Sequence, residues 1–182
     1  LQTLSAISPR SLRKEVFERT KKLKKLGICG SLGTLVEPDG DSHLFDYLCK
    51  LSTIENLKLH GADINSELQA LPKSNKFPTN LKRLSLEKTS LKWNIHMPII
   101  GKLQSLEVLK LKDKAFVGAE WKTEKGGFRS LKVLFIGDTD LDNWEVKADD
   151  LPELRWLILK HIKSLEQMPS DFEHMKNLER ID

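Results

Sequence analysis

The sequence predicts an α/β fold in which about eight short strands form one parallel sheet, with helical or irregular segments returning the chain behind it. Three observations predict this class. Leucine is the commonest residue, with 31 copies among 182 residues. The leucines recur at a fixed period along the chain. Within each period they alternate with other residues, as the inward side chains of a short strand do.

The repeated unit is L-x-x-L-x-L, with isoleucine at some of the leucine positions. The six complete copies have their apolar positions at Leu23-Leu26-Ile28, Ile54-Leu57-Leu59, Leu81-Leu84-Leu86, Leu106-Leu109-Leu111, Leu131-Leu134-Ile136 and Leu154-Leu157-Leu159. Weaker copies begin at Leu1 and Leu178. Repeats therefore start near residues 1, 23, 54, 81, 106, 131, 154 and 178. Their mean spacing of about 25 residues lies within the roughly 20–29 residues of leucine-rich repeats.

Each repeat can bury its leucines only against its neighbours, so the copies are expected to stack into one unit. We predict a single leucine-rich-repeat domain over residues 1–182. Its shape would be a horseshoe solenoid with the parallel sheet on the concave side and the irregular or helical segments on the convex side. The chain opens at Leu1 and stops at Asp182 inside the repeat pattern. We therefore expect it to be a fragment of a longer chain.

The segments between the strands carry signals of helices and loops. Ser8 followed by Pro9 is typical of a helix start. Apolar residues recur at helical spacing within 12–17, 44–51 and 172–178. Residues 30–42 and 120–127 contain turn formers and are predicted to protrude as loops. Trp93, Trp121 and Trp144 follow the strands at similar distances and are expected to pack on the convex side.

Several repeats continue behind the strand with a small residue and then an apolar one. The pairs are Ala62/Ile64, Thr89/Leu91 and Thr139/Leu141. They correspond to the asparagine and leucine in the tail of the leucine-rich-repeat pattern.

The strand positions between the leucines are predicted to face outward on the concave side, where proteins of this architecture bind their partners. In the late repeats these positions hold large apolar residues, namely Val108, Val133, Phe135, Trp156 and Ile158. Soluble proteins rarely expose a contiguous apolar patch without a partner. We therefore expect a protein-binding site for an effector or another partner here. Two alternatives stay open: further residues of the parent chain cover the patch, or the strand register differs.

The early repeats are basic. Residues 1–30 carry eight basic and two acidic side chains, and the first half of the chain is more positive than the second. Such a charge can steer an acidic partner, although a merely solvated helix face followed by a basic turn also explains it. The residues expected to contact the partner are Arg13, Lys14, Lys21, Lys22, Lys24, Lys25, Lys58 and Arg83.

No catalytic, cofactor or metal pattern stands out. The chain lacks the phosphate-binding loop, the Gly-rich dinucleotide loop, the Ser nucleophile elbow and the H-E-x-x-H zinc motif. The net charge of +4 is too small to indicate a nucleic-acid-binding protein. No apolar run is long enough to span a bilayer. Two cysteines and no N-glycosylation sequon favour a cytoplasmic protein, with nuclear or membrane-peripheral placement as alternatives.

Beyond the repeat, several stretches resemble the C-terminal repeats of plant intracellular immune receptors. They are FPTNLKRLSL at 77–86, IIGKLQSLEVLKL at 99–111, AFVG at 115–118, LPELRWL at 151–157 and LEQMP at 165–169. The chain is similar to the coiled-coil nucleotide-binding leucine-rich-repeat class, specifically the nightshade late-blight resistance group. The resemblance covers nearly the whole chain.

The resemblance implies a function in disease resistance. The domain would restrain the receptor's own nucleotide-binding switch domain through its basic early repeats, and would recognise a pathogen effector or a guarded host protein through its late repeats. The parent chain is expected to bind ADP or ATP in a central domain, and residues 1–182 are expected to bind no cofactor. The rival hypothesis is a leucine-rich-repeat substrate receptor of a ubiquitin ligase.

Overall fold

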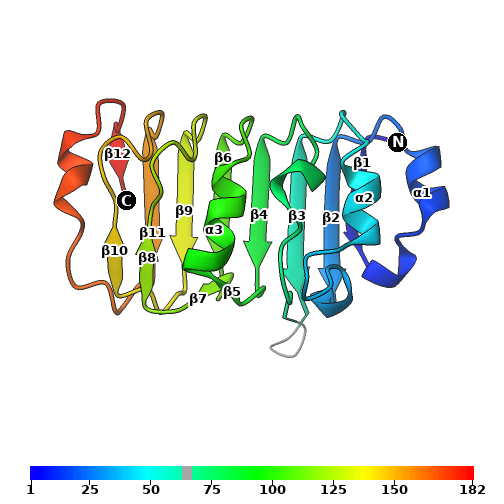
Figure 1. The fold of residues 1–182 in the computed structure, drawn as a ribbon, viewed down its shortest axis with the longest axis horizontal. Helices are drawn as coiled ribbons and strands as arrows, with labels where there is room; N and C mark the ends of the chain where they lie inside the picture. The colour runs from blue at the N-terminus through cyan, green and yellow to red at the C-terminus, as the bar shows by residue number, and fades with distance from the viewer. Residues whose placement is uncertain (63–66) are drawn as a thin grey trace.

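The computed structural model describes residues 1–62 and 67–182. Its central feature is an eight-stranded parallel sheet whose strands follow one another in chain order (Figure 1). This confirms the predicted α/β class with a parallel sheet of about eight strands. The strands are β1 (Thr3–Ile7), β2 (Lys25–Gly30), β3 (Asn56–Gly61), β4 (Arg83–Glu87), β6 (Val108–Lys112), β9 (Val133–Gly137), β11 (Trp156–Lys160) and β12 (Arg180–Ile181).

The leucine pattern sets the position of every strand in this sheet. Each strand begins two residues after a predicted repeat start, as β6 begins at Val108, two residues beyond Leu106. Equivalent leucines lie side by side on neighbouring strands, for example Leu84 opposite Leu109 and Leu109 opposite Leu134. Their side chains are fully buried on one side of the sheet. The alternate residues point to the other side, which we call the open face.

A second interaction joins successive repeats at the chain turn ahead of each strand. In five repeats the residue just before the repeat start is polar and donates a hydrogen bond to a backbone carbonyl of the preceding repeat, over 2.6–2.9 Å. Carbonyl groups in a turn have no partner in a neighbouring strand. These side chains supply the hydrogen-bond donors that the carbonyls would otherwise lack. The donors are Thr53, Asn80, Ser105, Ser130 and Asn177.

The side of the sheet opposite the open face is covered by helices and short strands (Figure 1). The helices are α1 (Lys14–Arg19), α2 (His43–Leu48) and α3 (Trp93–Gly101). Two small parallel sheets pair β5 (Leu91–Lys92) with β7 (Phe116–Val117), and β8 (Glu120–Lys122) with β10 (Asn143–Glu145). The remaining turns are the 3-10 helices η1 (Pro9–Ser11), η2 (Leu32–Thr34), η3 (Ser74–Lys76) and η4 (Ser170–His174).

Three tryptophans from successive repeats form a buried stack on this covered side. The ring centroids of Trp93 and Trp121 are 5.1 Å apart, and those of Trp121 and Trp144 are 4.8 Å apart, with nearly parallel planes in both pairs. Phe116 packs on Trp93 at one end, and Phe172 meets Trp144 edge-on at the other. We call Trp93, Trp121 and Trp144 the tryptophan stack. Their expected packing behind the sheet is confirmed.

Two predicted loops differ from expectation. Residues 120–127 do not all protrude, because Glu120–Lys122 forms strand β8 and places Trp121 in the stack. The segment 30–42 carries buried Leu32, Leu35 and Val36, so it folds back into the core rather than projecting from it. In both segments the burial of apolar side chains determines the structure, despite the neighbouring residues that favour turns.

The helical segments also differ in detail. The predicted helix after Ser8 is divided into η1 and α1, and the segment around Phe172 is a 3-10 helix. Helix α3, which contains Pro98, was not among the predicted helical segments. Of the tail pairs, Thr89 and Leu91 are fully buried and Thr89 donates to the carbonyl of Ala115 in the next repeat. The prediction for Ile64 lies outside the described residues.

A buried histidine caps the start of α3. The Nδ1 atom of His96 lies 2.9 Å from the backbone nitrogen of Lys92 and 3.2 Å from its carbonyl oxygen. An unprotonated Nδ1 in a neutral ring accepts from that N–H, whereas a protonated Nδ1 donates to the carbonyl. Burial holds the pKa of His96 below its usual value of 6.5. The positive charge of Lys92 acts in the same direction, whereas a hydrogen bond from the ring to the carbonyl oxygen of Lys92 raises the pKa and opposes it.

This arrangement predicts a loss of stability in mild acid. Because the pKa of His96 is lower in the folded chain, the unfolded chain binds the proton first as the pH falls through about 6.5. The free energy of unfolding should then decrease with falling pH, by at most about 1.4 kcal/mol per pH unit for this one proton. Denaturant unfolding between pH 8 and pH 5 measures the slope. The slope should flatten in His96→Gln but not in His174→Gln, whose histidine is exposed; equal slopes in all three proteins would contradict this assignment.

Candidate functional site

The five apolar residues predicted to face outward in the late repeats lie together on the open face. Val133 of β9 is in register with Val108 of β6 on one side and with Trp156 of β11 on the other. Phe135 is likewise in register with Ile158. We call these five residues the late apolar patch. Trp156 is 37% exposed, whereas the other four are half-buried, because side chains on strands this close cover one another.

Both aromatic rings of the patch have a cation over them. The Nζ atom of Lys112 lies 5.7 Å from the ring centroid of Phe135. The guanidinium carbon of Arg180 lies 5.0 Å from the ring of Trp156. Each contact is a cation–π interaction that orders the aromatic side chain. The sequence pattern does not indicate which cation lies over which ring.

Gly137 leaves the space into which the Phe135 ring leans. A β-carbon placed on Gly137 would lie 3.0 Å from one ring carbon of Phe135 and 3.4 Å from the next. Gly137 lies on the same side of β9 as Phe135 and is buried, because the Phe135 ring covers it. The glycine therefore leaves room for the Phe135 ring near the end of β9, where Gly137 is in register with Lys160 of β11.

The last strand supplies a polar partner for the exposed tryptophan. The Nε1 atom of Trp156 donates a hydrogen bond to Oδ2 of Asp182 over 3.0 Å, and Nε of Arg180 donates to Oδ1 over 2.6 Å. These bonds, led by the one from Arg180, hold the pKa of Asp182 below its usual value against the opposing effect of burial. Trp156 is thus held by two residues of the C-terminal segment: Asp182 accepts the hydrogen bond from its indole, and Arg180 lies over its ring.

The structure divides the predicted basic residues into two groups, all of them exposed. One group lies on the open face and comprises Lys25, Lys58 and Arg83. The other lies on α1 and in the turns around it, and comprises Arg13, Lys14, Lys21, Lys22 and Lys24. The sequence had placed all eight in one partner-binding set.

Ion pairs reduce part of this charge. Lys14 pairs with Glu18 over 3.5 Å on α1. On the open face Glu87 lies 3.7 Å from Lys58 and 3.1 Å from Nδ1 of His60. The group made by Lys21, Lys22 and Lys24 is therefore the more strongly positive one.

A shallow hollow of about 400 Å³ lies on the open face over β1, β2 and β3. Gly27 forms part of its floor, and the backbone of Ala6 would be 3.3 Å from a β-carbon there. Lys25 and Lys58 are among the residues around it. The hollow is thus lined both by basic residues of the open face and by small, mostly apolar strand residues.

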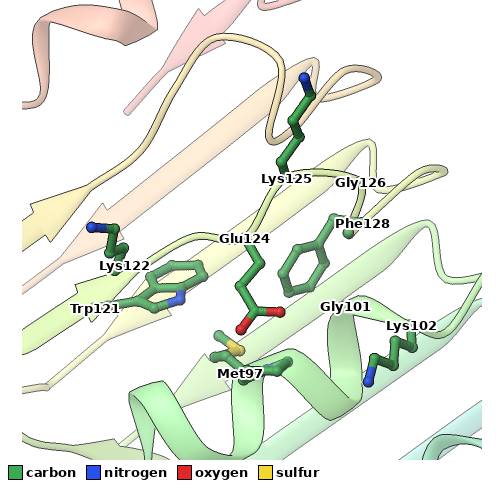
Figure 2. Close-up of a pocket in the computed structure, with 11 residues that line it drawn as sticks. Met97, Gly101, Lys102, Trp121, Lys122, Glu124, Lys125, Gly126 and Phe128 are labelled. Atoms are coloured by element: carbon green, nitrogen blue, oxygen red, sulfur yellow. The ribbon is translucent and has the colours of Figure 1, made fainter.

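Figure 2 shows a smaller hollow on the covered side, beside the tryptophan stack. Met97, Trp121 and Phe128 form its apolar walls, and the carboxylate of Glu124 points into it. Its volume is about 110 Å³. The hollow is bordered by flexible charged side chains and does not bring together an acid, a base and a nucleophile.

Among residues 1–62 and 67–182, no three metal-ligating side chains converge. Within the same residues, no helix has the length and apolar character needed to cross a bilayer. The two cysteines, Cys29 and Cys49, are both free thiols. The open face carries an apolar patch on its late strands and a basic region on its early ones.

The sheet is parallel and has one strand per period of leucines, with differing residues on its open face and helices behind it. This arrangement is compatible with a leucine-rich-repeat fold. No family model matches the chain. It is, however, 27% identical over 142 residues to disease resistance protein RPP8 of Arabidopsis thaliana, and 26% identical over 141 residues to RPP8-like protein 3 of the same plant. It is 33% identical over 146 residues to a late blight resistance protein homolog of Solanum demissum.

These matches cover 78%, 77% and 74% of this chain. The homologues of the chain are thus plant disease resistance proteins, and the resemblance to plant nucleotide-binding leucine-rich-repeat immune receptors, with the late-blight resistance group among them, is confirmed. The chain spans only 16%, 15% and 12% of the length of these relatives.

Proposed function

We propose that this chain is a non-catalytic protein-interaction and regulatory part of a plant disease resistance protein, built as a leucine-rich-repeat solenoid and acting in the cytoplasm. It recognises a pathogen effector directly, or through a guarded host protein. It also restrains the nucleotide-binding switch domain of its own parent chain. ADP or ATP binds to that switch domain in this proposal, not to residues 1–182. The relatives named above give the ubiquitin-ligase alternative no support.

The observation that carries the proposal is the presence of two unlike surfaces at opposite ends of one sheet. Basic side chains gather around α1 and β2–β4, whereas the late apolar patch occupies β6, β9 and β11. The basic turns around α1 are separated from the late apolar patch by β3 and β4, although Arg83 of β4 is in register with Val108 of the patch. Two partners can therefore be bound at the same time without competing for the same residues.

The mechanism couples these surfaces. The basic early repeats attract an acidic surface of the switch domain and keep that domain in its inactive state. An effector bound at the late apolar patch favours a state in which this contact is released. By linkage, the effector must bind the released state more tightly than the restrained one.

The test is co-precipitation of the chain with the nucleotide-binding region of its parent protein, at low and high salt. Replacing Lys21, Lys22, Lys24 and Lys25 together with glutamate should weaken capture roughly tenfold or more, because like charges then face each other. Capture by the unchanged chain should also fall at high salt, since exposed charges are screened.

A matched control carries the same charge change elsewhere, at the exposed residues Lys102, Lys125, Lys163 and Lys176. It should keep the capture of the unchanged chain. If both quadruple variants bind equally well, or if capture depends on Phe135 and Trp156 instead, the basic surface is not the internal contact and this proposal is wrong.

A further inference from the structure

We infer that the late apolar patch takes a partner segment of one particular chemistry, a stretch of polypeptide with apolar side chains flanked by carboxylates. This inference rests on the proposed function, because it specifies what the recognition surface prefers. It does not depend on the contact with the switch domain. Four properties of the patch support it.

The first is the geometry of the apolar residues. Val108, Val133 and Trp156 form a continuous row across three strands, with Phe135 and Ile158 in the next row. Trp156 is 37% exposed and its four apolar neighbours are half-buried. A tryptophan surrounded by smaller apolar side chains is typical of the centre of a protein interface.

The second is a frame of cations around the patch. Lys110 is in register with Phe135, Lys112 lies over the ring of Phe135, and Lys160 ends β11 on the opposite side. Arg180 covers the ring of Trp156. Among the residues that the structure describes, Lys110, Lys112 and Lys160 have no ion-pair partner. These three charges are available to a partner's carboxylates.

The third is that the nearby carboxylates are already engaged. Three of them pair with a lysine or arginine within the chain at 2.6–3.5 Å, and Asp138 lies 3.2 Å from Nδ1 of His161. Glu87, in register with Lys112, lies 3.7 Å from Lys58. The charges of Lys110, Lys112 and Lys160 are thus left beside the patch, and an acidic segment gains from them. The carboxylate pairs are Glu107 with Lys132, Asp138 with His161, Glu179 with Arg155 and Asp182 with Arg180.

The fourth is that the aromatic faces are occupied. With Lys112 over Phe135 and Arg180 over Trp156, a partner's lysine or arginine would meet like charge at both rings. The same cations hinder stacking of a nucleobase, which binds single strands by lying on such rings. The observations therefore favour an acidic and apolar peptide over a basic peptide or a nucleic acid.

The experiment measures fluorescence polarisation with the full-length parent protein and three labelled peptides of equal length. One alternates leucine and phenylalanine with aspartate, one replaces each aspartate with lysine, and one replaces each apolar residue with alanine. The first should bind about tenfold or more tightly than the other two, because it satisfies both the charge and the apolar requirement. Its affinity should fall as salt is raised.

Two variants with equal charge change locate the effect. The variant Lys110→Glu, Lys112→Glu and Lys160→Glu should lose the aspartate peptide and bind the lysine peptide better than before. The control Lys102→Glu, Lys125→Glu and Lys163→Glu should keep the original preference. Equal affinity for the aspartate and lysine peptides, or tighter binding to single-stranded DNA or to anionic vesicles, would overturn the inference.

A separate experiment distinguishes failure of this inference from failure of the proposed function. Phe135→Asp and Trp156→Asp are introduced into the full-length receptor, and effector-triggered cell death is scored in leaves beside the exposed controls Ile95→Asp and Met168→Asp. If the patch variants abolish the response while the peptides show no preference, recognition at the patch stands and only its proposed chemistry is wrong. If all four variants respond alike, recognition does not use this patch, and both the function assigned to it and the inference fail.

Discussion

Replacing Trp121 with alanine is expected to lower the free energy of unfolding by about 3–5 kcal/mol. Trp121 is 2% exposed and stacks between Trp93 and Trp144 in the repeats before and after it. The change would leave a cavity in the middle of the tryptophan stack and remove three aromatic pairs at once, including an edge-on contact with Phe128. Since a domain is stable by only about 5–15 kcal/mol, this single change would remove a large share of the total.

Urea unfolding monitored by far-ultraviolet circular dichroism measures this effect. Trp156→Ala is the matched control, because it deletes the same side chain from the exposed face. Its cost should be about 1 kcal/mol or less, as expected of a surface position. If the two variants were equally stable, the covered-side stack would not hold successive repeats together.

Gly61→Ala is expected to destabilise the fold by about 3 kcal/mol, the upper part of the usual range for an overpacked site. A β-carbon on Gly61 would lie 2.2 Å from the carbonyl oxygen of Lys88, a backbone atom that cannot move aside as a side chain would. Lys88 is itself held in place, since its N–H donates to the carbonyl of Asp113 over 3.0 Å. Relief of the clash would thus disturb the connections of three repeats.

Gly127→Ala provides the comparison. Its nearest neighbour would be the carbonyl oxygen of Glu124 at 3.5 Å, an ordinary van der Waals distance. Thermal unfolding should show a clear fall in Tm for Gly61→Ala and little change for Gly127→Ala. Equal Tm values would mean that β3 and the turn after β4 can separate at little cost.

Much of the sheet could be predicted from the sequence alone. The period of the leucines located all eight strands, because the inward and outward alternation is a local property of an extended chain. The same alternation assigned Val108, Val133, Phe135, Trp156 and Ile158 to the open face, where the structure places them side by side. The family resemblance, drawn from motifs between the leucines, agrees with the homologues found.

The segments behind the sheet were harder to predict. Glu120–Lys122 contains one apolar residue between two charged ones, and only its pairing with β10 makes it a strand. Helix α3 contains a proline, yet its buried apolar residues and the cap from His96 stabilise it. The structure of such segments depends on contacts with the next repeat. These contacts cannot be predicted from a local sequence pattern.

The order of residues along the chain was thus enough to establish the number and position of the strands, the apolar character of the late repeats and the basic character of the early ones. The folded chain was needed to show that Lys112 and Arg180 lie over Phe135 and Trp156, and that Gly137 makes room for the Phe135 ring. It also divided the basic residues between the open face and the turns around α1. The cause is the same in each case: alternation is fixed within a few residues, whereas these contacts join residues of different strands, whose side chains meet only once the repeats are stacked in register.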